Sequence, residues 1–160
     1  MTSPPRECRL RLARPADESL FLGWRNAPWS VALSGSQSTA TLDEHHHWFA
    51  QSLEGTTRLL FVVEEFSQPV GMVRYEVAGE DALEITIAII PEHVGEGLGT
   101  AAFVHSLPLV AGWRPMRKIR ARVLRGNGRS LSFFRHLGFV IVEDDGTSRL
   151  VRLELAAGGS

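Results

Sequence analysis

The chain has 160 residues, of which 44% are hydrophobic and 22% are charged, and its formal net charge at pH 7 is −1. This length suits one domain with a substantial core, and the composition excludes a disordered chain. The near-zero net charge excludes the strongly basic surface that would favour nucleic acid as a partner.

Apolar strands and amphipathic helices alternate along the chain. In the first half, the spacing of apolar residues predicts a strand, two helices and a hairpin of two strands over residues 8–12, 16–26, 42–53, 59–65 and 70–77. Pro28 is expected to limit the first helix, and the Ser-, Gly- and Thr-rich residues 29–40 are expected to form a loop. Residues 67–69 should form the hairpin turn. Thr41 and Glu44 have the spacing of a capping box.

The chain is organised around residues 82–104, which join a strand, a glycine-rich loop and a helix. Apolar residues alternate with polar or small ones up to Pro91, which is the period of a β-strand. Three glycines then precede an apolar run that predicts a helix over residues 100–110, which Pro108 is expected to kink or end. Glycine permits positive φ and close approach, so such a loop can direct backbone N–H groups at a phosphate. An ordinary turn is the alternative.

The last third of the chain predicts a strand, a helix and a final pair of strands over residues 118–124, 129–137, 139–143 and 149–155. Lys118, Arg120 and Arg122 alternate along one face of the first of these strands, which predicts a solvated face or, alternatively, contacts to phosphates. We expect a single domain over residues 1–155 and a flexible tail over residues 156–160.

The glycine-rich loop resembles motif A of the GNAT acetyltransferases, an Arg/Gln-x-x-Gly-x-Gly/Ala loop that holds the pyrophosphate of acetyl-CoA. Val94, Gly97 and Gly99 occupy the three named positions. Val94 departs from the pattern because it has no side-chain donor, and Glu96 adds a negative charge near the expected pyrophosphate. The resemblance implies that acetyl-CoA is bound by Ile89, Val94, Gly95, Gly97, Leu98, Gly99 and Thr100.

Residues 127–139 resemble motif B of the same family, in which an asparagine precedes a helix that ends in Leu-Gly-Phe. The resemblance implies that Asn127 caps this helix and reaches the pantetheine arm of the cofactor. Many family members carry a tyrosine two turns into the helix, which protonates the departing CoA thiolate. Phe134 occupies that cofactor-binding position, and because phenylalanine has no proton to give, the acid role does not transfer.

A third stretch combines Trp-Arg-Asn at residues 24–26, a Ser-rich loop, and Thr-x-x-Glu-His-x-x-Trp-Phe at residues 41–49. This combination is similar to a GNAT branch that includes the N-acetyltransferases of UDP-4-amino-sugars in pseudaminic acid synthesis. The resemblance assigns to the acceptor site Trp24, Arg25, Asn26 and Trp48. Flat aromatic walls with a few convergent donors are typical of a sugar or nucleotide pocket.

Two residues are candidates for the general base. Glu84 is the first, because a carboxylate on the central strand can be desolvated and its pKa raised, although a solvated or salt-bridged role is the alternative. His45 is the second, because the ordinary pKa of histidine is near neutral, and a surface position on its helix is the alternative. Backbone N–H groups near Ile89 are expected to polarise the thioester carbonyl, and the small Ala88 leaves room for an acetyl group.

His46 and His47 do not match the family pattern and are expected to be solvated. A run of three histidines suggests a metal site, but consecutive helical residues point about 100° apart and cannot share one ion. We therefore expect no metal cofactor.

The expected fold is an α/β (α+β) GNAT fold, a mixed sheet of about seven strands flanked by about four helices. The expected function is transfer of an acetyl group from acetyl-CoA to a primary amine of a small molecule, preferably a nucleotide-linked amino sugar. Acetylation of a protein N-terminus, as in ribosomal-protein acetyltransferases, and a CoA-binding module with little catalysis remain alternatives. We expect a monomer or homodimer without nucleic-acid or membrane partners. The lone cysteine, Cys8, and the absence of a long apolar run favour the cytoplasm.

Overall fold

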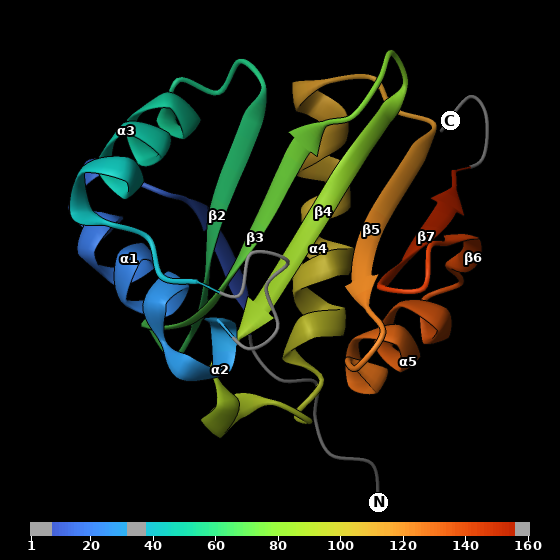
Figure 1. Cartoon of the computed structure of the whole chain (residues 1–160). Coiled ribbons are helices and arrows are strands. Elements are labelled where there is room, and N and C mark those ends of the chain that lie inside the picture. Colours follow the sequence, from blue (N-terminus) through green and yellow to red (C-terminus); the bar gives the residue numbers. More distant parts are fainter. Residues whose placement is uncertain (1–7, 32–37, 156–160) are drawn as a thin grey trace, which may run out of the picture.

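Seven strands form one mixed sheet in the computed structural model, which describes residues 8–31 and 38–155 (Figure 1). The order across the sheet is β1-β2-β3-β4-β5-β7-β6. The strands are Arg9–Leu12 (β1), Arg58–Glu65 (β2), Gln68–Val77 (β3), Ala82–Ile89 (β4), Lys118–Leu124 (β5), Val140–Asp144 (β6) and Ser148–Glu154 (β7). Among the described pairs, only β4 and β5 run parallel. The predicted mixed α/β fold is confirmed, whereas the expected tail at residues 156–160 lies outside the described residues.

The helices are Glu18–Asn26 (α1), Pro28–Val31 (α2), Leu42–Leu53 (α3), Leu98–Trp113 (α4) and Gly128–His136 (α5), with short 3-10 turns at Pro15–Asp17 (η1) and Pro91–His93 (η2). The α3 boundaries agree with the prediction, and the Oγ1 atom of Thr41 accepts a hydrogen bond from the Glu44 N–H at 3.1 Å, as an N-cap should. In the described part of the chain, none of the helices combines the length and the apolar character needed to cross a bilayer.

Helix α2 corrects the expectation that the chain after Pro28 is only a loop. Pro28 begins this helix, because the fixed φ of proline suits the first helical turn, whose N–H groups have no intrahelical partner anyway. The N–H of Ser30 donates to the Ala27 carbonyl at 2.9 Å. Most of the remaining expected loop, residues 32–37, lies outside the described residues.

Helix α4 extends beyond its predicted bounds, because it begins at Leu98 and continues to Trp113, so Pro108 does not end it. A proline inside a helix costs about 3 kcal/mol, but the buried side chains of α4, among them Phe103 and Val110, bind it to the sheet core. The indole N–H of Trp113 donates to the Gly55 carbonyl at 2.8 Å and anchors the helix end. Tertiary packing therefore overrides the local signal.

The hairpin turn between β2 and β3 lies one residue earlier than predicted. Glu65 pairs with Gln68, and the two turn residues, Phe66 and Ser67, have φ angles of 51° and 65°. Positive φ at both central residues is typical of a two-residue hairpin turn. Pro69 is tolerated inside β3 because it lies beside a register shift.

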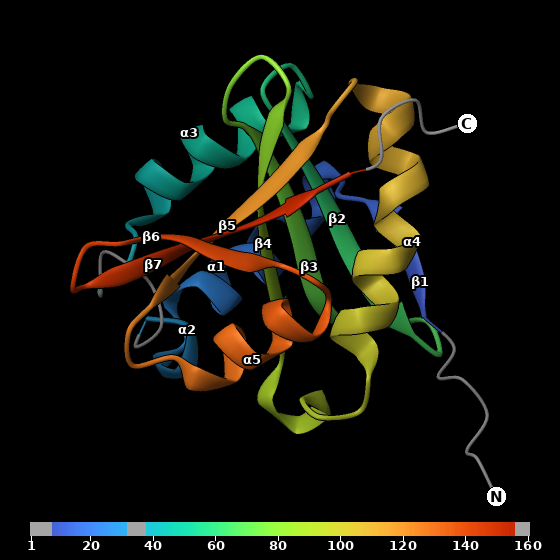
Figure 2. The same ribbon diagram turned by 90° about the vertical axis from the view of Figure 1, so that its right-hand side faces the viewer.

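Helices cover both faces of the sheet, with α4 on one side and α1 and α3 on the other (Figure 2). Alternate residues of β2 point into two separate cores. Phe61 and Val63 join the larger core under α4 and α5, whereas Leu60 and Val62 join the smaller core under α1 and α3. This alternation is the ordinary two-residue period of a β-strand, and it explains why β2 is apolar on both faces.

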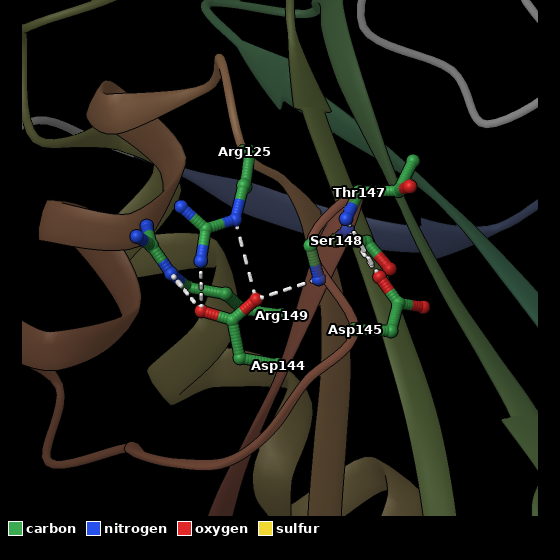
Figure 3. A network of polar contacts seen from close by, with 7 residues as sticks. Arg125, Asp144, Asp145, Thr147, Ser148 and Arg149 are labelled. Carbon is green, nitrogen blue, oxygen red and sulfur yellow. Dashed lines mark hydrogen bonds and ion pairs between the residues drawn. The ribbon is translucent and has the colours of Figure 1, made fainter.

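The predicted turn between β6 and β7 is held by two aspartates (Figure 3). Asp144 accepts hydrogen bonds from the Gly146 N–H at 3.0 Å and from Arg125 Nη2 at 2.6 Å, and Asp145 accepts from the Ser148 N–H at 2.7 Å. The Gly146 N–H and then Arg125 lower the pKa of Asp144 to about 2. Arg125 directly follows β5, so the turn also fixes the segment that leads into α5.

Candidate active site

The parallel strands β4 and β5 separate along their length. Their pairing runs only from Ala82 with Lys118 to Glu84 with Arg120. Beyond that point β4 continues to Ile89 against β3, and β5 continues against β7. The facing edges of the two strands therefore carry backbone groups that no strand pairs, and these groups are available to a ligand.

A cleft of about 1130 Å³ occupies this opening and extends to α1 and α3. Its volume slightly exceeds the ~300–1,000 Å³ of an ordinary small-molecule pocket, which suits two ligands side by side. The residues expected to bind the cofactor all line it, namely Ile89, Val94, Gly95, Gly97, Leu98, Gly99, Thr100, Asn127 and Phe134.

The glycine-rich loop ends at the first turn of α4, where the cleft is lined by backbone. Gly97 is the N-cap residue, with φ of 81° and ψ of 4°, and no side chain caps the helix. Among the residues that the structure describes, the first N–H groups of α4 therefore have neither an intrahelical nor a side-chain capping partner, which makes this end of the helix suited to an anion. At Gly99, a Cβ would lie 3.1 Å from the Phe133 ring, so glycine permits α4 and α5 to pack closely here.

Asn127 is the N-cap of α5, where its Oδ1 accepts from the Ser130 N–H at 3.1 Å. Phe134 is 5% exposed and packs edge-to-face with Phe133, which also lines the cleft and was not among the predicted site residues. The single tyrosine, Tyr75, is buried, and burial raises its pKa to about 12. Tyr75 is not part of the cleft lining, so it does not replace the missing acid of the α5 helix.

Where the cleft reaches α1 and α3, it is lined by the expected acceptor residues Trp24, Arg25 and Trp48. Asn26 corrects its prediction, because it does not line the cleft. Its Nδ2 donates to the Ala40 carbonyl at 2.9 Å and its Oδ1 accepts from the Ala40 N–H at 2.7 Å, so the side chain instead fixes the backbone that leads into α3.

Arg74 is a cleft residue that the sequence did not reveal. Its Nη2 donates to Thr86 Oγ1 at 3.1 Å, its Nε lies 2.9 Å from Glu76 Oε1, and its guanidinium lies 5.5 Å from the Trp48 ring centroid. Arg58 lies 5.4 Å from the same ring. Only the pairing of β3 with β4, which sets Arg74 opposite Thr86, identifies Arg74 as a site residue.

Glu84 lies at the point where β4 and β5 separate. Its side chain is 29% exposed, and its Oε1 lies 3.0 Å from Arg120 Nε. The carboxylate is therefore salt-bridged rather than desolvated, which corrects the basis on which it was chosen as a base. It still lines the cleft together with Thr86 and Ala88 from the same face of β4.

His45 is buried, at 5% exposure, rather than on the surface of α3. Its ring stacks on Phe49, and its Nδ1 is buried without a hydrogen-bond partner among the described residues. Burial and, less strongly, the charge of Arg25 lower its pKa against the opposing effect of Glu18. The imidazole is thus neutral near pH 7. His46 and His47 are exposed, as expected.

The burial of His45 predicts a pH-dependent stability. Because its folded pKa is below its unfolded value of about 6.5, the unfolded chain takes up the proton first, and the free energy of unfolding falls as pH drops below about 6.5. The free energy of unfolding, measured with denaturant between roughly pH 5 and pH 8, should depend less steeply on pH in His45→Gln than in the wild type. The exposed His47→Gln is the control, and equal slopes in His45→Gln and the wild type would contradict the prediction.

Comparisons with known proteins agree with this geometry. A family model described as an acetyltransferase (GNAT) domain matches residues 8–140, whereas no curated protein matches the chain. An acetyltransferase structure from Thermus thermophilus is 26% identical, with a TM-score of 0.75, and the match covers 92% of this chain and 97% of that one. Spermidine N-acetyltransferase from Vibrio cholerae, in complex with CoA and spermine, is 19% identical over 92% and 95% of the two chains, with a TM-score of 0.77. The N-acetyltransferase PseH from Campylobacter jejuni is 14% identical over 93% and 99%, with a TM-score of 0.69.

Proposed function

The chain belongs to the GNAT acetyltransferase family, and on this premise we propose that it transfers the acetyl group of acetyl-CoA directly to the primary amine of a nucleotide-linked amino sugar. The C–N bond forms while the thioester C–S bond breaks, the amine loses one proton to a base, and CoA leaves as its thiolate. The observation that carries this proposal is a single cleft, lined at one end by the glycine-rich loop and at the other by tryptophans and arginines.

The glycine-rich end provides the site for acetyl-CoA. The unpartnered N–H groups at the start of α4 suit the pyrophosphate, and the open edge of β4 beyond Glu84 offers backbone groups to the pantetheine arm. We expect a backbone N–H near Ile89 to stabilise the negative charge that develops on the thioester oxygen. With phenylalanine at position 134, the thiolate leaves without a dedicated acid.

The charge of the acceptor end favours an anionic acceptor. Arg25 and Arg74 line the cleft, and Arg74 lies over the indole ring of Trp48. Trp24 and Trp29 also line the cleft. Guanidinium groups recognise phosphate, and indole rings stack on bases and sugars. A polyamine carries positive charge and would be repelled by the same arginines. The combination therefore supports a nucleotide-linked acceptor.

Glu84 is our proposed base, acting directly or through a water molecule, because it faces the cleft at the closed end of the opening between β4 and β5. His45 is the second candidate, since its neutral imidazole also contributes to the cleft lining. Its buried Nδ1 leaves Nε2 as the nitrogen that would accept a proton.

One observation favours a protein N-terminus as an alternative acceptor. Glu44 lines the cleft near His45, and a carboxylate there would attract a cationic amine. A thermal-shift panel with acetyl-CoA, UDP-4-amino-sugars and amino-terminal peptides separates the possibilities, because a ligand that binds the folded state raises the melting temperature. Stabilisation by peptides and not by nucleotide sugars would replace the proposal, and binding of acetyl-CoA without turnover of any amine would indicate a CoA-binding module.

The proposed acceptor site predicts a selective effect of Arg25→Ala. Arg25 lines the cleft from α1, and its Nη1 donates to the Ser38 carbonyl at 2.7 Å. The substitution should raise the KM for a UDP-4-amino-sugar about tenfold or more, as expected for loss of one charge-assisted contact of ~1.5–3 kcal/mol, and should leave the KM for acetyl-CoA nearly unchanged. Steady-state kinetics with each substrate varied in turn measure both constants.

The exposed Arg135→Ala in α5, outside the cleft lining, is the matched control and should change neither constant. An equal rise in both KM values for Arg25→Ala would contradict an acceptor-specific role. A wild-type enzyme that acetylates peptides and ignores nucleotide sugars would contradict the amino-sugar assignment itself.

A further inference from the structure

Three side chains from separate elements converge beside the glycine-rich loop. They are Glu65 at the end of β2, His93 in η2 and Glu96 in the loop itself, and one ligand atom of each lies within 4.8 Å of the others. We propose that this cluster binds a divalent transition-metal ion of the zinc class, and that the bound ion strengthens the binding of acetyl-CoA.

The distances within the cluster fit a tetrahedral ion. His93 Nδ1 lies 3.4 Å from Glu65 Oε1 and 3.4 Å from Glu96 Oε2. Tetrahedral donors at the usual zinc distances of ~2.0–2.2 Å stand about 3.3–3.6 Å apart. Both distances from His93 therefore already match one shared ion, and the ligand atoms of the two carboxylates lie within 4.8 Å of each other. Three protein ligands leave a fourth position for water or another ligand.

The burial of one ligand is a second observation that points to a cation. The Glu65 side chain is only 3% exposed, and its carboxylate is directed at the His93 ring. Two carboxylates that converge on one imidazole repel each other, and the repulsion is stronger where water is largely excluded. A divalent ion between Glu65 and Glu96 offsets that repulsion.

The donor set selects the class of ion. One imidazole with two carboxylates suits zinc and its transition-metal neighbours, whereas magnesium and calcium prefer oxygen ligands alone. The sequence did not indicate this site, because Glu65 lies 28 residues before His93 and no short spacing motif connects them. The expectation of no metal was based on the His45–His47 run, which contributes no ligand here.

The position of Glu96 connects the ion to acetyl-CoA, and this step rests on the proposed function. Glu96 lies between Gly95 and Gly97, so its charge is close to the expected pyrophosphate. A bound cation offsets that charge and ties the loop to η2 and to the end of β2. Both effects favour an anionic ligand at the start of α4.

Zinc titration of the metal-stripped 160-residue chain, in competition with a chromophoric chelator, tests the site without any activity measurement. We expect one tight site in the wild type and at least a ~100-fold loss of affinity in His93→Ala, beyond the ~10–100-fold cost of losing an outer partner of a ligand. Glu96→Gln is the second variant, for the case that His93→Ala does not fold. Glutamine keeps the shape of the partly exposed Glu96 side chain but not its charge, so this variant should also lose zinc affinity. His47→Ala controls for adventitious binding by surface histidines and should bind like the wild type.

Absence of zinc binding, or binding that His93→Ala and Glu96→Gln leave unchanged, would overturn the site.

Calorimetric titration with CoA then tests the coupling between zinc binding and CoA binding. Zinc should tighten CoA binding to the wild type at least roughly fivefold and should have no effect on Glu96→Gln, which should bind CoA more tightly than the metal-free wild type. If CoA binds neither the metal-free nor the zinc-loaded wild type, the proposed function fails. The zinc titration still decides whether the metal site exists.

Discussion

Gly97→Val should abolish measurable acetyl-CoA binding or weaken it at least about 100-fold. Gly97 has φ of 81°, and the position its Cβ would take has no protein atom within 4 Å, so a valine side chain would project into open space. Gly97 lines the cleft at the first turn of α4, where we place the pyrophosphate. The added side chain would exclude the phosphate from the N–H groups of the helix and remove their charge-assisted hydrogen bonds.

Isothermal titration calorimetry with acetyl-CoA measures this effect, and Gly55→Val controls for backbone strain. Gly55 also has positive φ, at 69°, with open space at its Cβ position, but it lies after α3 and outside the cleft lining. Both substitutions should cost ~1–2 kcal/mol of stability, because a β-branched residue is disfavoured at positive φ. Only Gly97→Val should lose the cofactor, and wild-type affinity in that variant would place the pyrophosphate elsewhere.

Glu84→Gln should lower kcat by roughly 10²–10⁴-fold, the usual contribution of a general base. Glutamine has the same shape but accepts no proton, so acetyl-CoA should still bind with near wild-type affinity. The acidic limb of the pH–rate profile should move or disappear if Glu84 is the group that must be ionised. Pre-steady-state and steady-state kinetics over a pH series, together with CoA titration, separate the chemical step from binding.

Loss of the ion pair between Glu84 and Arg120 could itself reduce activity through the structure. Glu154→Gln is therefore the control, since Glu154 also forms an ion pair with an arginine of the sheet, Arg152, at 3.1 Å. It should leave kcat unchanged. An unchanged pH–rate profile in Glu84→Gln would remove Glu84 from the mechanism, and His45→Gln would then be the variant expected to lower kcat.

Elements with strong local signals agreed between sequence and structure. Helix α3 has the predicted boundaries because its N-cap, Thr41, and its apolar period are both contained in a short segment. The order of strands and helices, and the family motifs around Gly97 and Asn127, are also properties of consecutive residues. Where packing competes with a local signal, the local signal does not decide alone, since Pro108 does not end α4.

Roles that depend on a neighbour were harder to predict. Asn26 was expected at the acceptor but hydrogen-bonds to the backbone of Ala40. For Glu84 the sequence left a desolvated and a salt-bridged carboxylate open, and the structure shows an ion pair with Arg120. Arg74 was not singled out at all. Each of these outcomes is decided by a residue that lies distant in the sequence, which no pattern of spacing records.

By itself, the sequence determined the fold class, the glycine-rich loop and the residue types along the cleft, because periodicity, capping and turn chemistry act over a few residues. Only the tertiary structure decided that β4 and β5 separate beyond Glu84 and that Arg74 faces Trp48. It also decided that Glu65, His93 and Glu96 meet beside the loop. These arrangements depend on strand register and packing between distant segments, since a contact across the sheet is fixed by the pairing of whole strands.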